Sequence, residues 1–324
     1  MTPRSILAVT DFSVQGSHAI ARAALLCAEH RATLTLVYLA HQAGLPPPDA
    51  AVRLSHHALQ VRQRHNIEVS ADTRMDFTAV DVARKAADAD LVVWGTAPVR
   101  RLRAWFGAHP AIKMLRAGQR PVIVVCNPAD QPYQSLMVAV DFSQASHPVV
   151  ELGLALHSSA RVALFHAIST ANEGKLRYAE VSERAIQTYR EQCRRHAQDR
   201  MVTLTDSYDA RRNRLSSSLG RGDPARQVLV AQQNAAADLI VVGKHPASAF
   251  SDLMFESVAQ RILREARTDV LVVPHGFQPA SRGAAVGRLA TDLPVRRVKA
   301  GAPRTPSHPN PAALREPLHL FHIP

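Results

Sequence analysis

The sequence predicts an α/β protein made of two tandem copies of a doubly wound parallel sheet. Three observations predict this fold class: a long internal repeat, short apolar strands that alternate with segments of helical periodicity, and a length of 324 residues, which suits about two domains.

The repeat is visible in the residues themselves. Residues 6–13, ILAVTDFS, return as residues 136–143, LMVAVDFS, at an offset of 130. Residues 89–95, ADLVVWG, return as residues 237–243, ADLIVVG, at an offset of 148 that holds to the end of the copy. A repeat of this length indicates duplicated domains rather than a solenoid. The change of offset predicts extra residues in the middle of the second copy.

The first copy opens with a strand, a helix and a strand. Residues 6–10 and 34–39 are short β-branched runs, and residues 16–30 between them have apolar side chains at helical spacing. Such a βαβ unit has parallel strands that are buried on both faces. The rest of this copy is expected to hold a weak strand, two buried strands and a helix, at residues 67–70, 91–94, 122–126 and 111–116.

The second copy repeats this order. Its expected strands are residues 136–140, 161–166, 215–219, 239–242 and 270–273. The extra residues fall at 175–201, where an apolar stripe predicts one long amphipathic helix. The stripe consists of Tyr178, Val181, Ala185, Tyr189, Cys193, Ala197 and Met201.

These elements divide the chain into two domains, residues 1–128 and 133–275, and a tail, residues 276–324. The tail has seven Lys or Arg against two acids and eight of the 21 prolines, and this predicts a disordered basic segment. It contributes to a net charge of +12. Contact of the tail with a polyanion is one alternative. Because no aromatic or Gly-Arg pattern accompanies the charge, nucleic acid is not an expected partner.

Composition argues against several other classes of protein. The sequence has no apolar stretch near the roughly 20 residues that span a bilayer and no signal-peptide pattern, so we expect a soluble, cytoplasmic protein without membrane contact. Cys27, Cys126 and Cys193 are too few and too scattered for a disulfide framework or a CxxC metal site. Asp11, Ser13 and His18 supply the residue types of a triad but lack the context of a nucleophile elbow, so we predict no enzyme.

Ligands of open parallel sheets bind beyond the carboxyl ends of the strands. Asp11 and Asp141 end the first strand of each copy, and Gly95 and Gly243 end the fourth. An aspartate at this place either caps the following helix or accepts a hydrogen bond from a ligand amino group, and the sequence leaves both alternatives open.

Several of these stretches resemble the universal stress protein family. They are VAVDFS at 138–143, RGDP at 221–224, ADLIVVG at 237–243, and the segment from SVA at 257–259 to VLVVP at 270–274. The likeness covers about residues 3–275. It implies the adenine nucleotide alpha hydrolase-like fold with five parallel strands in each copy. It also implies an intramolecular pseudo-dimer in which the last strands of the two copies pair.

The resemblance also locates a nucleotide loop, and there this chain departs from the family. ATP-binding members carry one glycine after the fourth strand, another three residues later, and Gly-Ser or Gly-Thr after nine further residues. Here Gly243 is followed by Pro246 and by Glu256-Ser257 at those positions, and Gly95 by Pro98 and Ala108-His109.

These substitutions work against a triphosphate for physical reasons. Glycines let backbone N–H groups approach phosphates, whereas proline lacks that donor. Like unit charges at 4 Å repel by about 4 kcal/mol at an effective dielectric near 20, so Glu256 would oppose the phosphates by more than one hydrogen bond returns. We therefore predict degenerate ATP loops in both copies.

The resemblance implies that part of the nucleotide site is kept. Gly222 and Asp223 would line the pocket together with Asp141, Gly243 and Ser257, while Met75-Asp76 replaces Gly222-Asp223 in the first copy. The first copy also has basic residues that could compensate for missing glycines, namely Arg100, Arg101, Arg103, Lys113, Arg116 and Arg120.

The sequence therefore predicts a non-enzymatic stress-response or signalling module. No cofactor is expected. The alternative is an ATP- or AMP-binding protein with weak hydrolysis or phosphate transfer. Besides the pseudo-dimer, a homodimer and a protein partner stay open as modes of association.

Overall fold

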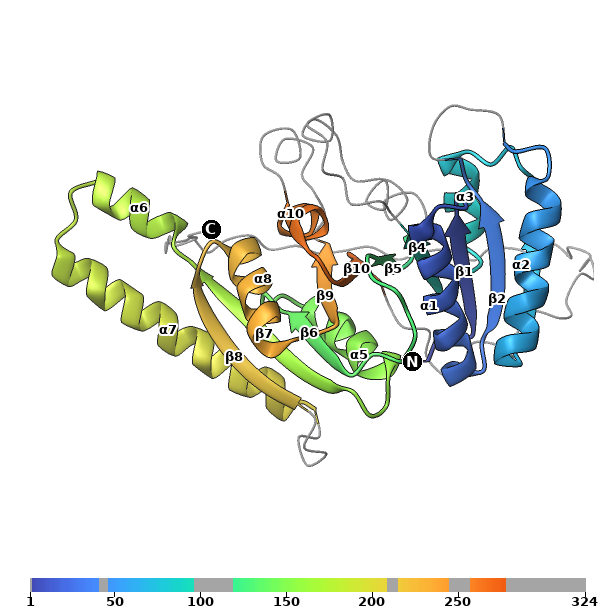
Figure 1. Cartoon of the computed structure of the whole chain (residues 1–324). Coiled ribbons are helices and arrows are strands. Elements are labelled where there is room, and N and C mark those ends of the chain that lie inside the picture. The colour runs from blue at the N-terminus through green and yellow to red at the C-terminus, as the bar shows by residue number, and fades with distance from the viewer. Residues whose placement is uncertain (1, 41–45, 96–118, 209–214, 245–256, 278–324) are drawn as a thin grey trace, which may run out of the picture. The chain divides into compact units, whose positions relative to one another are not determined.

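A computed structural model of the chain describes residues 2–40, 46–95, 119–208, 215–244 and 257–277. Residues 1–281 form one compact unit. Ten strands form one sheet in the order β3-β2-β1-β4-β5-β10-β9-β6-β7-β8, with helices between most of the strands that follow one another in the chain (Figure 1). This confirms the predicted fold class.

The first copy contains β1 to β5 in the predicted order. Its elements are β1 (Ser5–Thr10), α1 (Val14–His30), β2 (Thr33–Tyr38), α2 (Ala50–His65), β3 (Val69–Asp72), α3 (Ala79–Ala86), β4 (Leu91–Gly95) and β5 (Val122–Val125). These strands pair in parallel. The helix expected at residues 111–116 lies outside the described residues.

The second copy repeats the arrangement with a longer middle. Its elements are β6 (Ser135–Ala139), α5 (Ser146–Leu156), β7 (Arg161–Ser169), α6 (Ala171–Tyr178), α7 (Glu183–Asp206), β8 (Leu215–Gly222), α8 (Pro224–Ala235), β9 (Leu239–Lys244), α10 (Val258–Glu265) and β10 (Asp269–Pro274). These strands are also parallel to one another.

The expected single helix at residues 175–201 is wrong, because two helices occupy this region. The chain turns between α6 and α7 at Glu180, which has a left-handed φ of 56°, and Ser182 caps α7 by accepting the N–H of Ala185. The predicted apolar stripe fails at its start, where Tyr178 is 93% exposed. The side chains that α7 buries are Ile186, Ala197, Met201 and Leu204.

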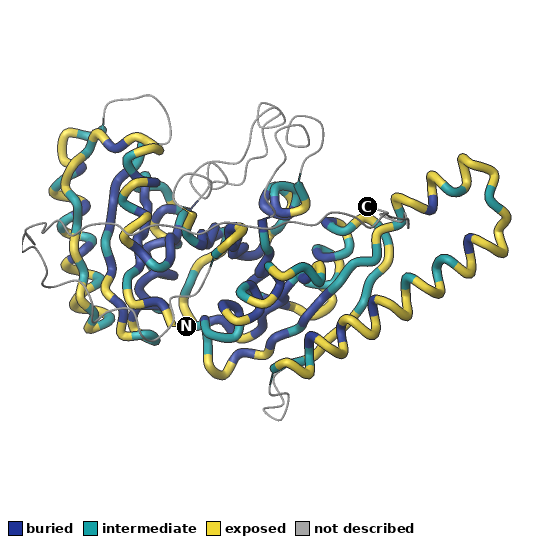
Figure 2. Tube along the Cα trace, turned by 180° about the vertical axis from the view of Figure 1, so that it is seen from behind, coloured by how far each residue is buried: buried dark blue, intermediate teal, exposed yellow. Residues whose placement is uncertain are grey.

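The buried strands form the centre of the molecule, while much of α6 and α7 faces solvent (Figure 2). Every residue of β5 and β10 is buried. Runs of Val, Ile and Leu without polar alternation form such strands because helices cover both faces of a parallel sheet.

The two copies meet where β5 pairs antiparallel with β10, with Ile123 opposite Leu271. Asp269, 1% exposed, receives hydrogen bonds from the Tyr133 hydroxyl at 2.8 Å and the Cys126 N–H at 2.8 Å. Arg22 of the first copy lies 3.3 Å from the same carboxylate. Burial raises the pKa of Asp269 above its ordinary value, against these stabilising contacts.

Neither a spanning helix nor a metal cluster is found in the part of the chain that the structure describes. None of its helices combines the length and apolarity that crossing a bilayer requires. No three His, Cys, Asp or Glu side chains among these residues gather closely enough to hold a metal ion.

Candidate functional site

The loop after the first strand of each copy has the same unusual geometry. Phe12 and Phe142 have left-handed φ angles of 60° and 63°, which are rare for bulky residues and mark a tight turn. The preceding carboxylates close these turns, because Asp11 Oδ1 accepts the Ser13 N–H and Asp141 Oδ1 accepts the Ser143 N–H, each at 2.9 Å. Both aspartates therefore lie at the strand ends where the sequence placed them.

The helix that follows is not capped by either aspartate. In the first copy, Ser13 Oγ accepts the Gly16 N–H at 3.0 Å and caps α1. In the second copy α5 has no side-chain cap, and Asp141 Oδ1 instead accepts the Ser146 hydroxyl at 2.8 Å. These carboxylates therefore stabilise the turn and do not cap the helix.

A cavity of about 200 Å³ lies at this edge of the second copy. The end of β10 and the start of α8 give it apolar walls, and its polar lining comes from Asp141, Ser146, His166, Gly243, Lys244 and His275. Lys244, only 7% exposed, follows Gly243 directly at the end of β9. Two of the predicted site residues, Asp141 and Gly243, are thus brought together.

Of the other three predicted residues of the second copy, two cap helices beside this cavity and one ends a strand. Asp223 caps α8 by accepting the Arg226 N–H and forms an ion pair with Arg261 at 2.7 Å. Ser257 caps α10 in a reciprocal box with Gln260. Gly222 ends β8 with a left-handed φ of 140°. Their sequence neighbours Pro224 and Val258, rather than these residues, line the cavity.

The first copy differs at the matching place. A Cβ added to Gly95 would lie 1.9 Å from the Gln15 carbonyl oxygen and 2.7 Å from the Gly16 nitrogen, so the backbone of α1 directly covers the end of β4. A Cβ on Gly243 would meet only a Val149 methyl, at 3.2 Å. The space that forms part of a cavity in one copy is filled by backbone in the other.

His166 adds a hydrogen-bonding group that sequence analysis missed. Burial lowers its pKa, and the hydrogen bond to the Val140 carbonyl at 2.8 Å and the charge of Asp141 offset this only in part. The ring is therefore neutral at neutral pH. Because a carbonyl only accepts, Nδ1 carries the proton and Nε2 is left as an acceptor. The Phe142 ring packs against this ring at a tilt of 32°, with centroids 4.2 Å apart.

A signal for His166 and Lys244 was present in the sequence. The register of β7 places His166 where β2 has Tyr38, which stacks on Phe12 with centroids 4.9 Å apart. Lys244 takes the place of Thr96 at the offset of 148. Both are sites where the repeat changes a residue next to the carboxyl end of a strand.

The residues from which we predicted degenerate ATP loops lie outside the described residues. They are Pro98, Ala108, His109, Pro246 and Glu256, together with all but one of the basic residues between 100 and 120. The exception is Arg120, whose guanidinium donates to the Ala87 carbonyl at 2.7 Å.

Comparisons with known proteins agree with this architecture. A profile of the Universal stress protein family matches residues 132–274. No curated protein was found to match the chain. The structure is similar to that of a universal stress protein from Archaeoglobus fulgidus DSM 4304, with a TM-score of 0.59 and 12% identity over 85% of this chain and 97% of that one.

Two structures from Pseudomonas aeruginosa are similarly close. One, assigned as a universal stress protein in strain UCBPP-PA14, has a TM-score of 0.58 and 18% identity over 84% of this chain and 93% of that one. The other, a protein of unknown function from strain PAO1, has a TM-score of 0.57 and 19% identity over 84% and 92%. The profile over the second copy and the similar folds lead to one conclusion: residues 132–274 form a universal stress protein domain, and the chain has the universal stress protein fold.

Proposed function

We propose that the chain is a non-enzymatic stress-response or signalling module of the cytoplasm that holds one small ligand, in its second copy. The observation that carries this proposal is the cavity beside Gly243, set against the backbone contact that covers Gly95. Residues 1–128 and 133–275 would be the two domains of an intramolecular pseudo-dimer, with residues 276–324 as a tail.

The lining of the cavity suits a flat ring with a polar edge. Asp141 and the His166 Nε2 offer acceptors, Lys244 offers a buried cation, Ser146 and His275 add two further polar side chains, and most of the remaining walls are apolar. Clefts for ligands of drug size occupy about 300 to 1,000 Å³, so a cavity of about 200 Å³ suits a ring or a nucleoside better than a whole nucleoside triphosphate. Together with the degenerate loops expected from the sequence, this supports adenine or a similar heterocycle as the ligand.

Isothermal titration with adenosine, AMP, cyclic AMP and ATP tests this proposal. We expect one site per chain, an affinity for ATP within about threefold of that for AMP, and no ATP turnover. Saturation at 100 times the dissociation constant should raise the free energy of unfolding by about 2.7 kcal/mol.

The repeat supplies a matched pair of variants. Asp141→Asn should weaken adenosine binding about tenfold, because a carboxylate accepts a hydrogen bond about 1.4 kcal/mol better than an amide in such a site. Asp11→Asn makes the same change in the first copy and should leave binding unchanged. Equal weakening by both variants, or two sites per chain, would contradict a single site.

The alternative function is ATP binding with weak hydrolysis or phosphate transfer. Lys244 favours it, since a buried lysine at the end of β9 can pair with a phosphate. A preference for ATP over AMP of tenfold or more, abolished by Lys244→Met, would establish this alternative in place of the first proposal. Absence of any adenine binding at millimolar concentration would refute adenine as the ligand.

A further inference from the structure

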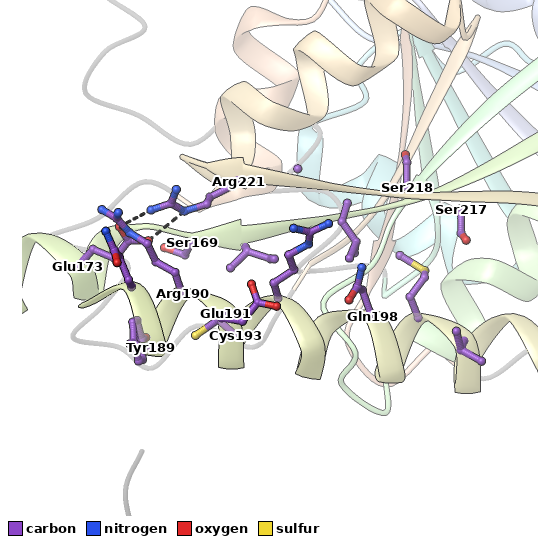
Figure 3. A pocket seen from close by; sticks show the side chains of 17 residues that line it. Ser169, Glu173, Tyr189, Arg190, Glu191, Cys193, Gln198, Ser217, Ser218 and Arg221 are labelled. Carbon is purple, nitrogen blue, oxygen red and sulfur yellow. Dashed lines mark hydrogen bonds and ion pairs between the residues drawn. The ribbon is translucent and has the colours of Figure 1, made fainter. Parts of the chain in front are cut away.

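A groove of about 1000 Å³ lies away from the ligand cavity, between α7 and the outer strands β7 and β8 (Figure 3). Strand β8 is the last strand of the sheet, and β7 is its single strand neighbour among the described residues. Half of its backbone N–H and C=O groups therefore point away from the sheet.

This edge lacks the features that usually prevent strand addition. Proteins protect sheet edges with short strands, prolines or charged residues. Strand β3, at the other end of the sheet, is four residues long, whereas β8 spans eight residues without a proline. Its first six residues, LSSSLG, are uncharged, and Ser216, Ser217 and Ser218 are exposed.

One end of the groove is closed by an ionic cluster. Glu173 of α6, 6% exposed, accepts hydrogen bonds from Arg190 Nε at 2.9 Å and Arg221 Nε at 3.0 Å (Figure 3). The hydrogen bonds from Arg221 and Arg190 lower the pKa of Glu173, so it is charged at neutral pH. One carboxylate thus faces two guanidinium groups.

The remaining charges of the groove leave it cationic. Arg194 also lines it and has no ion pair within the described part of the chain. Glu191 lines it too, but its carboxylate pairs at 3.3 Å with Arg195, which is not a lining residue. Between the charges, Ile168, Met201 and Leu219 provide apolar walls.

We propose that β8 accepts an extended acidic peptide as an added strand, with alternate side chains directed into the groove beside α7. Main-chain hydrogen bonds to a free edge give such complexes their affinity, and pockets for alternate side chains give them specificity. The carboxylate of the peptide would pair with Arg194. Charge excludes the tail of this chain as the occupant, because residues 276–324 hold seven basic residues against two acids. A second copy paired through β8 would bring two cationic grooves together.

The experiment uses the full chain and fluorescence anisotropy. The probe is a dye-labelled, end-capped heptapeptide in which valine alternates with glutamate, so that one face of the added strand is acidic. We expect saturable binding that Arg194→Glu weakens about tenfold or more, equivalent to about 1.4 kcal/mol. Arg184→Glu is the matched control, since it makes the same change at an exposed residue of α7 that does not line the groove and has no ion pair within the described residues, and it should alter binding less than about threefold.

Peptide backbone variants separate strand addition from simple charge attraction. N-methylation of alternate residues removes the donors of one edge of the peptide. Methylation of one set of alternate residues should abolish binding, while methylation of the other set should not. Equal effects of both sets, equal binding of a peptide with lysine in place of glutamate, or no binding up to millimolar protein would overturn the proposal. So would sedimentation showing that the chain dimerises through β8 and thereby excludes the peptide.

Discussion

The two copies share a fold and a repeated Asp-Phe-Ser turn, yet among the described residues the end of the fourth strand lines a cavity in the second copy and lies against the backbone of α1 in the first. The difference follows from where the first helix of each copy begins. Helix α1 begins at Val14, whereas α5 begins at Ser146, two residues later at the offset of 130. The earlier start places the Gln15 backbone against Gly95.

A proline accounts for the later start of α5. The first four N–H groups at a helix N-terminus need no intrahelical partner, so proline is tolerated only there. Pro148 is the third residue of α5 and lies at the limit of this tolerance. If α5 began at Gln144, Pro148 would have to donate a hydrogen bond that it cannot make. In the first copy His18 occupies this position and α1 extends fully.

The largest expected effect concerns the glycines. Gly95→Ala should cost more than about 3 kcal/mol, because its Cβ would overlap backbone that cannot move without displacing α1. Gly243→Ala should cost less than about 1 kcal/mol, since only a Val149 methyl must shift. Urea unfolding of both variants measures the difference, and equal costs would show that the first copy is as open as the second.

The junction between the copies gives the next effect. Asp269→Asn should lower the free energy of unfolding by about 3 kcal/mol, because Arg22 would keep a buried charge without its partner. The pseudo-symmetric positions are Pro121 and Leu152, so no second ion pair of this kind exists to compensate. Asp238→Asn is the control. Asp238 accepts a backbone N–H at the start of β6, as Asp90 does at the start of β1. We therefore expect Asp238→Asn to lower the free energy of unfolding by much less than Asp269→Asn does.

Exchange of the residues at the helix start should change the ligand cavity directly. Pro148→His allows α5 to extend toward Gln144, and we expect adenosine affinity to fall about tenfold as the cavity narrows, with stability changed by less than about 1 kcal/mol. A crystal structure of the variant would show the helix start directly. An unchanged α5 with unchanged affinity would mean that the proline does not set the cavity.

The smallest effect is a pH dependence. The folded-state pKa of His166 is lowered by burial below its ordinary 6.5, so the folded chain binds fewer protons there than the unfolded chain. The neutral ring therefore makes its full contribution to the free energy of unfolding above about pH 6.5. This contribution is lost as the pH falls through the lowered folded-state pKa. His166→Tyr, which introduces the residue of the first copy, should reduce the slope of stability between pH 7 and pH 5. Tyr38→His, the reverse change, should steepen it.

The sequence predicted the strands well because buried parallel strands are continuous apolar runs, and all ten lie within a few residues of their expected places. For the same reason it placed Asp141 and Gly243 near the carboxyl ends of such strands, where both line one cavity, and their role in binding stays a prediction. It failed at residues 175–201 because the capping signal at Ser182 was weaker than the apparent stripe. It could not distinguish Gly95 from Gly243, whose difference arises from packing against a helix far earlier in the chain.

The pairing of β5 with β10 inside a single polypeptide has an evolutionary consequence. In a homodimer, every substitution at a twofold interface occurs on both sides at once, so an arginine opposite an aspartate requires both residues in each subunit. In this single chain, by contrast, a substitution changes only one of the two copies. The ion pair between Arg22 and Asp269, with leucine and proline at the mirror positions, is an arrangement that duplication within one gene makes available, and the two halves can diverge independently.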